Sequence, residues 1–290
     1  MGQLLALLTA LLYSSAVIFY KKAVVLTSPF ALNCFKNCVA LILLAITSAL
    51  LGQTGLLSIP EKDLLVMLAS GAIGIGISDT LFLMTLQRLG ASRTALVDCL
   101  YSPCVILFSF LTTRETLDPV AILGGGLILG SVLLSSQRGF DVPMPRKDFW
   151  IGCALGAAAM ATVAYAIVMM KPILHSYPLT LMSAVRMVGG LAILILILPF
   201  HPDRRSVREI FRPQPAWTWM LLGTFFGSYL SIVSWLAGFK YSQAGIAALL
   251  NQTSTIFIVV FAWLLLKEPM TRLKLLAVGM ALAGTVIILY

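Results

Sequence analysis

The chain alternates between long apolar runs and short polar stretches. Ten of the runs have close to the 20 residues that a helix needs to cross a bilayer core of about 30 Å. They cover residues 3–22, 30–51, 64–87, 93–112, 118–136, 149–171, 178–199, 216–239, 244–266 and 271–290. The stretches between them are too short for a soluble domain; the longest are residues 137–148 and 200–215. The pattern predicts an all-α integral membrane protein with ten transmembrane helices.

The polar positions of the first half recur in the second half about 153 residues later. Asp98 corresponds to Asn251 and Glu115 to Glu268, both at that spacing. A duplication on this scale indicates two homologous units. We place them at residues 1–138 and 148–290.

Each unit contains five predicted helices, which is an odd number. The second unit must therefore enter the membrane from the opposite side to the first. Two inverted repeats are typical of secondary transporters, whose site lies near the midplane between the halves. The pattern therefore favours a carrier that works by alternating access.

Composition agrees with a lipid environment. Of the 290 residues, 60% are hydrophobic and only 11% charged, with a mean hydropathy of +0.99. A soluble domain has about 25% charged residues. Residues 1–20 lack the basic start and small-residue cleavage site of a signal peptide, so we expect a retained first helix.

The net charge of +9 does not indicate nucleic-acid binding, because the basic residues are scattered over short loops. In a membrane protein such charges set orientation. If the N-terminus were cytoplasmic, the cytoplasmic loops would carry four Lys and Arg residues and the other side fourteen. The count therefore favours both termini outside a cell (inner) membrane.

Glycines recur at spacings that let helix backbones approach closely. Gly126 and Gly130 are four residues apart, as are Gly152 and Gly156, and Gly223 and Gly227, while Gly71, Gly74 and Gly76 cluster in one predicted helix. We expect static packing at most of them.

Two duplicated motifs carry a family resemblance. The first joins an Ala-Leu pair to an acidic residue, as Ala95-Leu96 to Glu115 and again as Ala248-Leu249 to Glu268. The second places a basic residue seven or eight positions after a proline, as Pro29 with Lys36 and Pro178 with Arg186.

With these motifs the whole chain resembles the EamA-type branch of the drug/metabolite transporter (DMT) superfamily, which usually has Arg where Lys36 stands. The resemblance implies ten helices, no cofactor, and transport of small metabolites or drugs, often as export. It also implies cytoplasmic termini, against the charge count.

Four charged residues fall well inside predicted helices, away from the charges near the helix ends: Lys36, Asp79, Asp98 and Arg186. A charge at bilayer depth costs several kcal/mol unless it meets a partner or a water-filled cavity. Lys36 can pair with Asp79 or Asp98 and only lock the bundle, or all four can line a substrate cavity. Arg186 has no acidic counterpart inside the predicted helices of its own half, and its fork of donors suits a carboxylate or phosphate. Asp98 is also a candidate for proton coupling.

A mixed cationic and acidic lining suits a zwitterion, so the best substrate prediction is amino acids or related compounds. Neutral residues at similar depth complete the predicted substrate-binding set: Tyr13, Ser14, Phe82, Tyr165, Tyr229, Trp235, Asn251 and Gln252. Asn251 and Gln252 rank highest among them, because a buried amide needs a partner. We read Glu115 and Glu268 as caps of the helix that follows each.

Other functions remain as alternatives. The basic pair would also suit a flippase or exchanger for phosphate-bearing lipid- or nucleotide-linked sugars, and the family includes multidrug exporters. An enzyme is not predicted, because no catalytic motif appears. The five cysteines all fall inside apolar runs, and we expect packing rather than metal ligation. The predicted partners are a small-molecule substrate and the bilayer, and the chain is compatible with a monomer.

Overall fold

The structure, a computed structural model, describes all residues except 54, 56–58, 137–144, 267–271 and 290. Its first half contains α1 (Gly2–Leu26), α2 (Pro29–Leu50), α3 (Glu61–Gly71), η2 (Ala72–Ile77), α4 (Ser78–Asp98), α5 (Tyr101–Thr113) and α6 (Pro119–Ser136). Its second half contains α7 (Arg146–Val168), η3 (Lys171–Ile173), α8 (Leu179–Ile197), η4 (Leu198–Phe200), α9 (Arg204–Glu209), α10 (Trp217–Gly223), η5 (Thr224–Ser231), α11 (Ile232–Lys240), α12 (Ala244–Asn251), α13 (Thr253–Leu266) and α14 (Arg272–Leu289).

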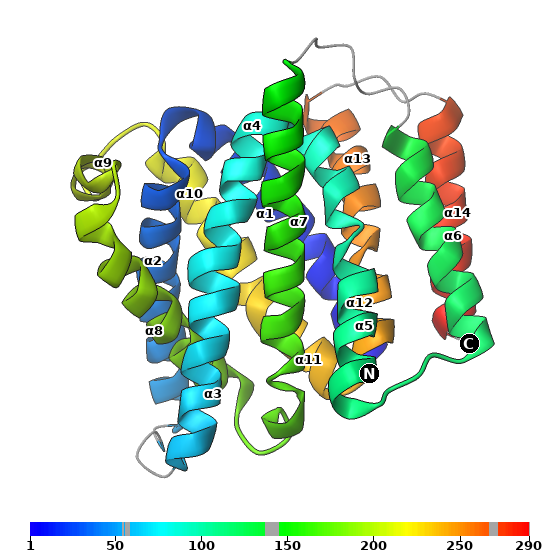
Figure 1. Cartoon of the computed structure of the whole chain (residues 1–290), viewed down its shortest axis with the longest axis horizontal. Coiled ribbons are helices and arrows are strands. Elements are labelled where there is room, and N and C mark those ends of the chain that lie inside the picture. Colours follow the sequence, from blue (N-terminus) through cyan, green and yellow to red (C-terminus); the bar gives the residue numbers. More distant parts are fainter. Residues whose placement is uncertain (54, 56–58, 137–144, 267–271, 290) are drawn as a thin grey trace.

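Equivalent helices of the two halves run in opposite directions (Figure 1). We call the end of the bundle where α1 begins and α14 ends the lower end, as Figure 1 draws it, and the opposite end the upper end. Helix α1 rises from the lower end, whereas α7 descends from the upper end. The predicted all-helical architecture of two inverted repeats is confirmed.

Among the described residues, six helical segments are long and apolar enough to cross a membrane, namely Gly2–Leu26, Pro29–Leu50, Glu61–Gly90, Arg146–Ile173, Leu179–Phe200 and Trp217–Lys240. Four shorter apolar helices accompany them, at Tyr101–Thr113, Pro119–Ser131, Ala244–Ile258 and Leu275–Ile288. A multi-pass membrane protein is confirmed, while the count of ten crossings stays a prediction.

Two of the predicted helices are broken at equivalent places. The run 93–112 is divided, because α4 continues past a kink at Gly90 to Asp98 and α5 begins only at Tyr101. The run 244–266 is divided at Gln252, between α12 and α13. Discontinuous helices are typical of transporter binding sites, since irregular backbone is tolerated at membrane depth where it lines a cavity.

Two helices also change their hydrogen-bond register at equivalent places. Ala72–Ile77 and Thr224–Ser231 are π-helical, so each C=O is bonded one residue further along than in an α-helix. Such segments are rare and often mark functional sites. An apolar sequence shows no sign of this change, and the sequence reading therefore missed both segments.

Glycines bring helices of the two halves into close contact. A Cβ on Gly71 of α3 would collide with the backbone of Arg186 in α8, and one on Gly189 of α8 with the backbone of Leu68. The same holds for α6 and α14, where a Cβ on Gly284 would strike the carbonyl of Gly124. These approaches place Arg186 directly beside the π-helical turn η2.

Candidate functional site

A cavity of about 190 Å³ lies between the two repeats. Its walls come from α1, α2, η2, α4, α5, α7 and α8, and from η5, α11, α12 and the start of α13. The polar and aromatic lining residues are Thr9, Tyr13, Tyr20, Lys36, Ser78, Asp79, Phe82, Asp98, Tyr101, Arg186, Ser228, Ser231, Trp235, Asn251, Gln252 and Ser254. Both π-helical segments contribute to the wall, through Gly74 and Ile75 and through Gly227 and Ser228.

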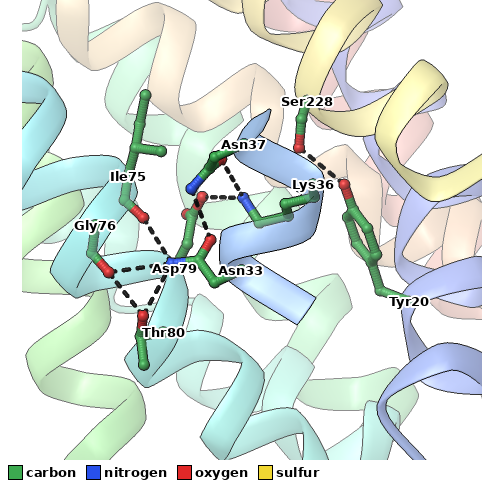
Figure 2. Close-up of polar contacts among 9 residues, drawn as sticks. All are labelled: Tyr20, Asn33, Lys36, Asn37, Ile75, Gly76, Asp79, Thr80 and Ser228. Atoms are coloured by element: carbon green, nitrogen blue, oxygen red, sulfur yellow. Dashed lines mark hydrogen bonds and ion pairs between the residues drawn. The ribbon is translucent and has the colours of Figure 1, made fainter. Parts of the chain in front are cut away.

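Lys36 is neutralised inside this wall (Figure 2). Its Nζ lies 2.5 Å from Oδ2 of Asp79 and donates a second hydrogen bond of 3.2 Å to Oδ1 of Asn37. The Lys36 side chain is only 5% exposed, whereas that of Asp79 is 34% exposed. The pair therefore turns a carboxylate, and not an ammonium, toward the open space.

Asn33 holds the end of the π-helical turn η2, which precedes Asp79. Its Nδ2 donates to the carbonyls of Ile75 and Gly76, at 3.0 and 3.1 Å, and to Oγ1 of Thr80 at 2.9 Å. A π-helical turn leaves carbonyls without their usual partner, and a buried carbonyl needs one. Asn33 in α2 supplies it, and Figure 2 shows this amide beneath the ion pair.

Arg186 is the most completely buried large side chain of the site, at 1% exposed. Its guanidinium carbon lies 5.2 Å from the centre of the Trp235 ring. In the part of the chain that the structure describes, its Nε and Nη1 have no hydrogen-bond partner. Two donors of a buried cation therefore stand available at the cavity wall.

Asp98 and Asn251 occupy equivalent positions, each directly before a helix break. Oδ1 of Asp98 and both amide atoms of Asn251 are buried and lack a partner among the described residues. Gln252 ties the two breaks together, because its Nε2 donates to the Asp98 carbonyl over 2.8 Å. This part of the wall therefore offers two hydrogen-bond acceptors, Oδ1 of Asp98 and Oδ1 of Asn251, and one donor, Nδ2 of Asn251. Arg186 offers donors only.

Aromatic rings fix the polar groups of the cavity. The Trp235 Nε1–H donates to Oη of Tyr101 over 3.1 Å, which orients the ring under Arg186. Tyr13 and Phe82 pack with ring centres 6.2 Å apart. The Tyr20 hydroxyl shares a 2.8 Å hydrogen bond with Ser228 across the halves.

Nine of the twelve predicted site residues line the cavity, namely Tyr13, Lys36, Asp79, Phe82, Asp98, Arg186, Trp235, Asn251 and Gln252. Three lie elsewhere. Ser14 donates a hydrogen bond to the Ser254 carbonyl, and Tyr229 shares a hydrogen bond with Thr47. Tyr165 is 43% exposed, and its ring contacts the ring of Phe108.

The sequence reading missed Thr9, Tyr20, Ser78, Tyr101, Ser228, Ser231 and Ser254. Ser78 and Ser231 differ by the repeat spacing of 153, and so do Tyr101 and Ser254. Extending the repeat comparison to hydroxyl-bearing residues would have found these two pairs. Among the described residues, no disulfide joins any of the five cysteines, and no group of His, Cys, Asp and Glu could hold a metal ion.

Comparisons with known proteins follow the same division of the chain. The sequence pattern of the EamA-like transporter family matches residues 1–137 and again residues 150–290. No curated protein matches. A solved structure described only as "Crystal structure of protein" superposes with a TM-score of 0.80 at 15% identity, covering 99% of this chain and 95% of that one. At this identity the likeness shows the fold alone.

Fold and cavity together define a polytopic membrane protein with a polar site enclosed between two inverted repeats. The chain belongs to the EamA-like transporter family. It is therefore a multi-pass membrane transporter of the drug/metabolite type, embedded in lipid, and members of this family are generally not enzymes.

Proposed function

We propose that this chain is a secondary transporter that exports amino acids or related small zwitterions by alternating access. It would act in the cell (inner) membrane, where the charge count favours both termini outside. The observation that carries the proposal is the set of unpartnered polar atoms around one cavity. Arg186 offers two donors, Asp98 one acceptor, and Asn251 one of each.

A zwitterion complements this set. Its carboxylate accepts from Arg186, whose planar fork suits such a group. Its ammonium donates to Asp98 and to the Asn251 carbonyl. A ligand with only one of the two charges would leave the other buried group unpaired, at a cost of about 1–3 kcal/mol or more.

The size and charge of the cavity support a small ligand. Its 190 Å³ is below the 300–1,000 Å³ typical of drug-sized ligands. The phosphate of a sugar conjugate would need both Lys36 and Arg186 as cationic partners, but Lys36 already forms an ion pair with Asp79. We therefore favour the amino acid over the sugar conjugate and the bulky drug.

Binding measurements on purified protein in lipid nanodiscs test the proposal. The probes are the common L-amino acids, followed by a matched set of leucine, 3-methylbutylamine and 4-methylpentanoate, which differ in their charged groups. Amino acids, and not the amine or the acid, should raise the melting temperature. Arg186→Gln and Asp98→Asn should abolish the shift, whereas Lys62→Gln, at an exposed cation, should not. Equal stabilisation by amine or acid would overturn the zwitterion.

Export is tested separately in proteoliposomes loaded with the amino acid that binds. Release into the medium should depend on Arg186 in the same way as binding does. A chain that binds amino acids but releases none would not be an amino-acid carrier.

A further inference from the structure

The lower end of the bundle carries a polar bridge away from the cavity. Lys171, in η3 just after α7, donates from Nζ to the carbonyls of Phe239 and Ser242, at 2.7 and 2.5 Å. The same Nζ lies 3.6 Å from Oε1 of Glu115, at the end of α5. One ammonium therefore joins the ends of α5 and α7 to the turn between α11 and α12.

Glu115 extends this bridge to the start of α12. Its Oε2 accepts the backbone N–H of Ala244 over 2.9 Å and so caps that helix. The preceding residue, Arg114, has a φ of 57°, in the left-handed region that side chains rarely adopt. Backbone strain of this kind clusters at functional positions.

A second polar chain runs beside the first. The Lys240 ammonium at the end of α11 donates to the Tyr177 carbonyl over 3.2 Å, and the Tyr177 hydroxyl donates to Oδ2 of Asp63 in α3 over 2.6 Å. The bond to the carboxylate raises the pKa of Tyr177. This chain joins α11 to α3 through the loop between α7 and α8.

Contacts between the halves are of another kind at the upper end. There the described contacts are made by rings: Lys22 lies 4.0 Å from the Trp219 ring centre, and the Phe30 and His201 rings stack at 3.9 Å. The apolar burial in such contacts is non-directional, so helices can shift by small amounts while keeping it. Directional bonds to backbone carbonyls break when the helix ends separate.

Helix α12 links the polar bridge to the ligand site. It begins at Ala244, which Glu115 caps, and ends at Asn251 and Gln252 in the cavity wall. We infer that Lys171 and Glu115 form a latch that closes the cavity at the lower end, and that α12 couples this latch to ligand binding. The inference rests on the proposed function only in taking the chain as an alternating-access carrier.

The latch is tested by a distance across the lower end. Spin labels are attached to a ketone-bearing amino acid placed at the exposed positions Lys62 and Tyr241, on α3 and after α11, which leaves the native cysteines in place. Pulsed electron paramagnetic resonance then measures the distance distribution in nanodiscs without ligand. Glu115→Gln and Lys171→Gln should each increase a longer-distance population about fivefold or more, as loss of a partly buried ion pair allows.

A matched control lies in the same loop as Glu115. Asp118 caps its own helix α6, by accepting the Ala121 N–H over 2.7 Å, and makes no described bond across the halves. Asp118→Asn should leave the distribution as in the wild type. An unchanged distribution in both latch variants, or an equal change with Asp118→Asn, would overturn the latch.

The outcome of the distance measurement depends neither on misfolding of the variants nor on amino-acid binding. Glu115→Gln keeps the shape of the side chain and can still accept the Ala244 N–H through its amide oxygen, so a folded variant is expected. The measurement uses no ligand, so failure to bind amino acids would leave the latch standing, and an absent distance change would leave the zwitterion site standing.

Discussion

The guanidinium of Arg186 lies over the ring of Trp235, 5.2 Å from its centre, and is not paired with a carboxylate. No Asp or Glu oxygen lies within ion-pair distance of it among the described residues. Asp79 lines the same cavity, but Lys36 already holds its carboxylate at 2.5 Å. A buried cation without a carboxylate partner destabilises the empty protein, and the proposed function accounts for Arg186 through the ligand that it would bind.

Replacing Arg186 should therefore stabilise the protein while removing its binding. We expect Arg186→Met to increase the free energy of unfolding by about 1–4 kcal/mol, because an apolar side chain of similar length replaces an unsatisfied charge. Thermal unfolding in nanodiscs measures the gain, and calorimetry with amino acids measures the loss of binding. A lower melting temperature in Arg186→Met would mean that the guanidinium has a structural partner after all.

Lys36 and Asp79 should behave in the opposite way. Lys36→Met or Asp79→Leu alone strands one charge of the pair, and we expect each to lower the stability by about 2 kcal/mol. This value is discounted from that of a fully buried pair, because the Asp79 side chain is 34% exposed. The double variant should cost clearly less than the sum of the two.

Unfolding of the four proteins in a double-mutant cycle gives the coupling energy. Additive effects would show that the 2.5 Å contact contributes nothing to stability. The sequence left open the alternative that Lys36 only locks the helix bundle through an ion pair. A large coupling energy between Lys36 and Asp79 would favour that alternative.

The two halves, their inversion and nine of the 16 polar and aromatic residues of the cavity lining were readable from the sequence. A charge or amide in an apolar run has few physical reasons to be there. The π-helical turns were not readable, since they change only the hydrogen-bond partner of each carbonyl.

Glu115 was predicted as a cap of the next helix. It caps α12 of the other half, while Asp118 caps α6. Sequence shows neighbours along the chain, and this partner is 129 residues away. Glu268 lies outside the described residues.

Close approach of α3 and α8 should make Gly71 intolerant of any side chain. A Cβ there would overlap the Arg186 carbonyl, which is backbone and cannot rotate away. We expect Gly71→Ala to lower the stability by about 2–3 kcal/mol and to weaken amino-acid binding by displacing Arg186.

Gly126→Ala is the control, because nothing lies within 4 Å of its Cβ position. It should be neutral or slightly stabilising, as Ala favours a helix over Gly by about 1 kcal/mol. Thermal unfolding compares the two, and equal effects would contradict the packing.

Trp235 should contribute to binding through its ring more than through its N–H. Trp235→Phe keeps an aromatic face beneath Arg186 but loses the 3.1 Å hydrogen bond to Tyr101. A neutral hydrogen bond contributes about 1 kcal/mol, so we expect amino-acid affinity to fall about fivefold. Trp235→Leu also removes the cation–π contact and lets the guanidinium move, and the loss should then exceed tenfold. Dissociation constants from calorimetry compare both variants with the wild type.

Tyr101→Phe supplies the matched control, since it removes the same hydrogen bond from the other side. It should reproduce Trp235→Phe and not Trp235→Leu, and if it matched Trp235→Leu, the Tyr101 hydroxyl and not the ring would hold Arg186 in place.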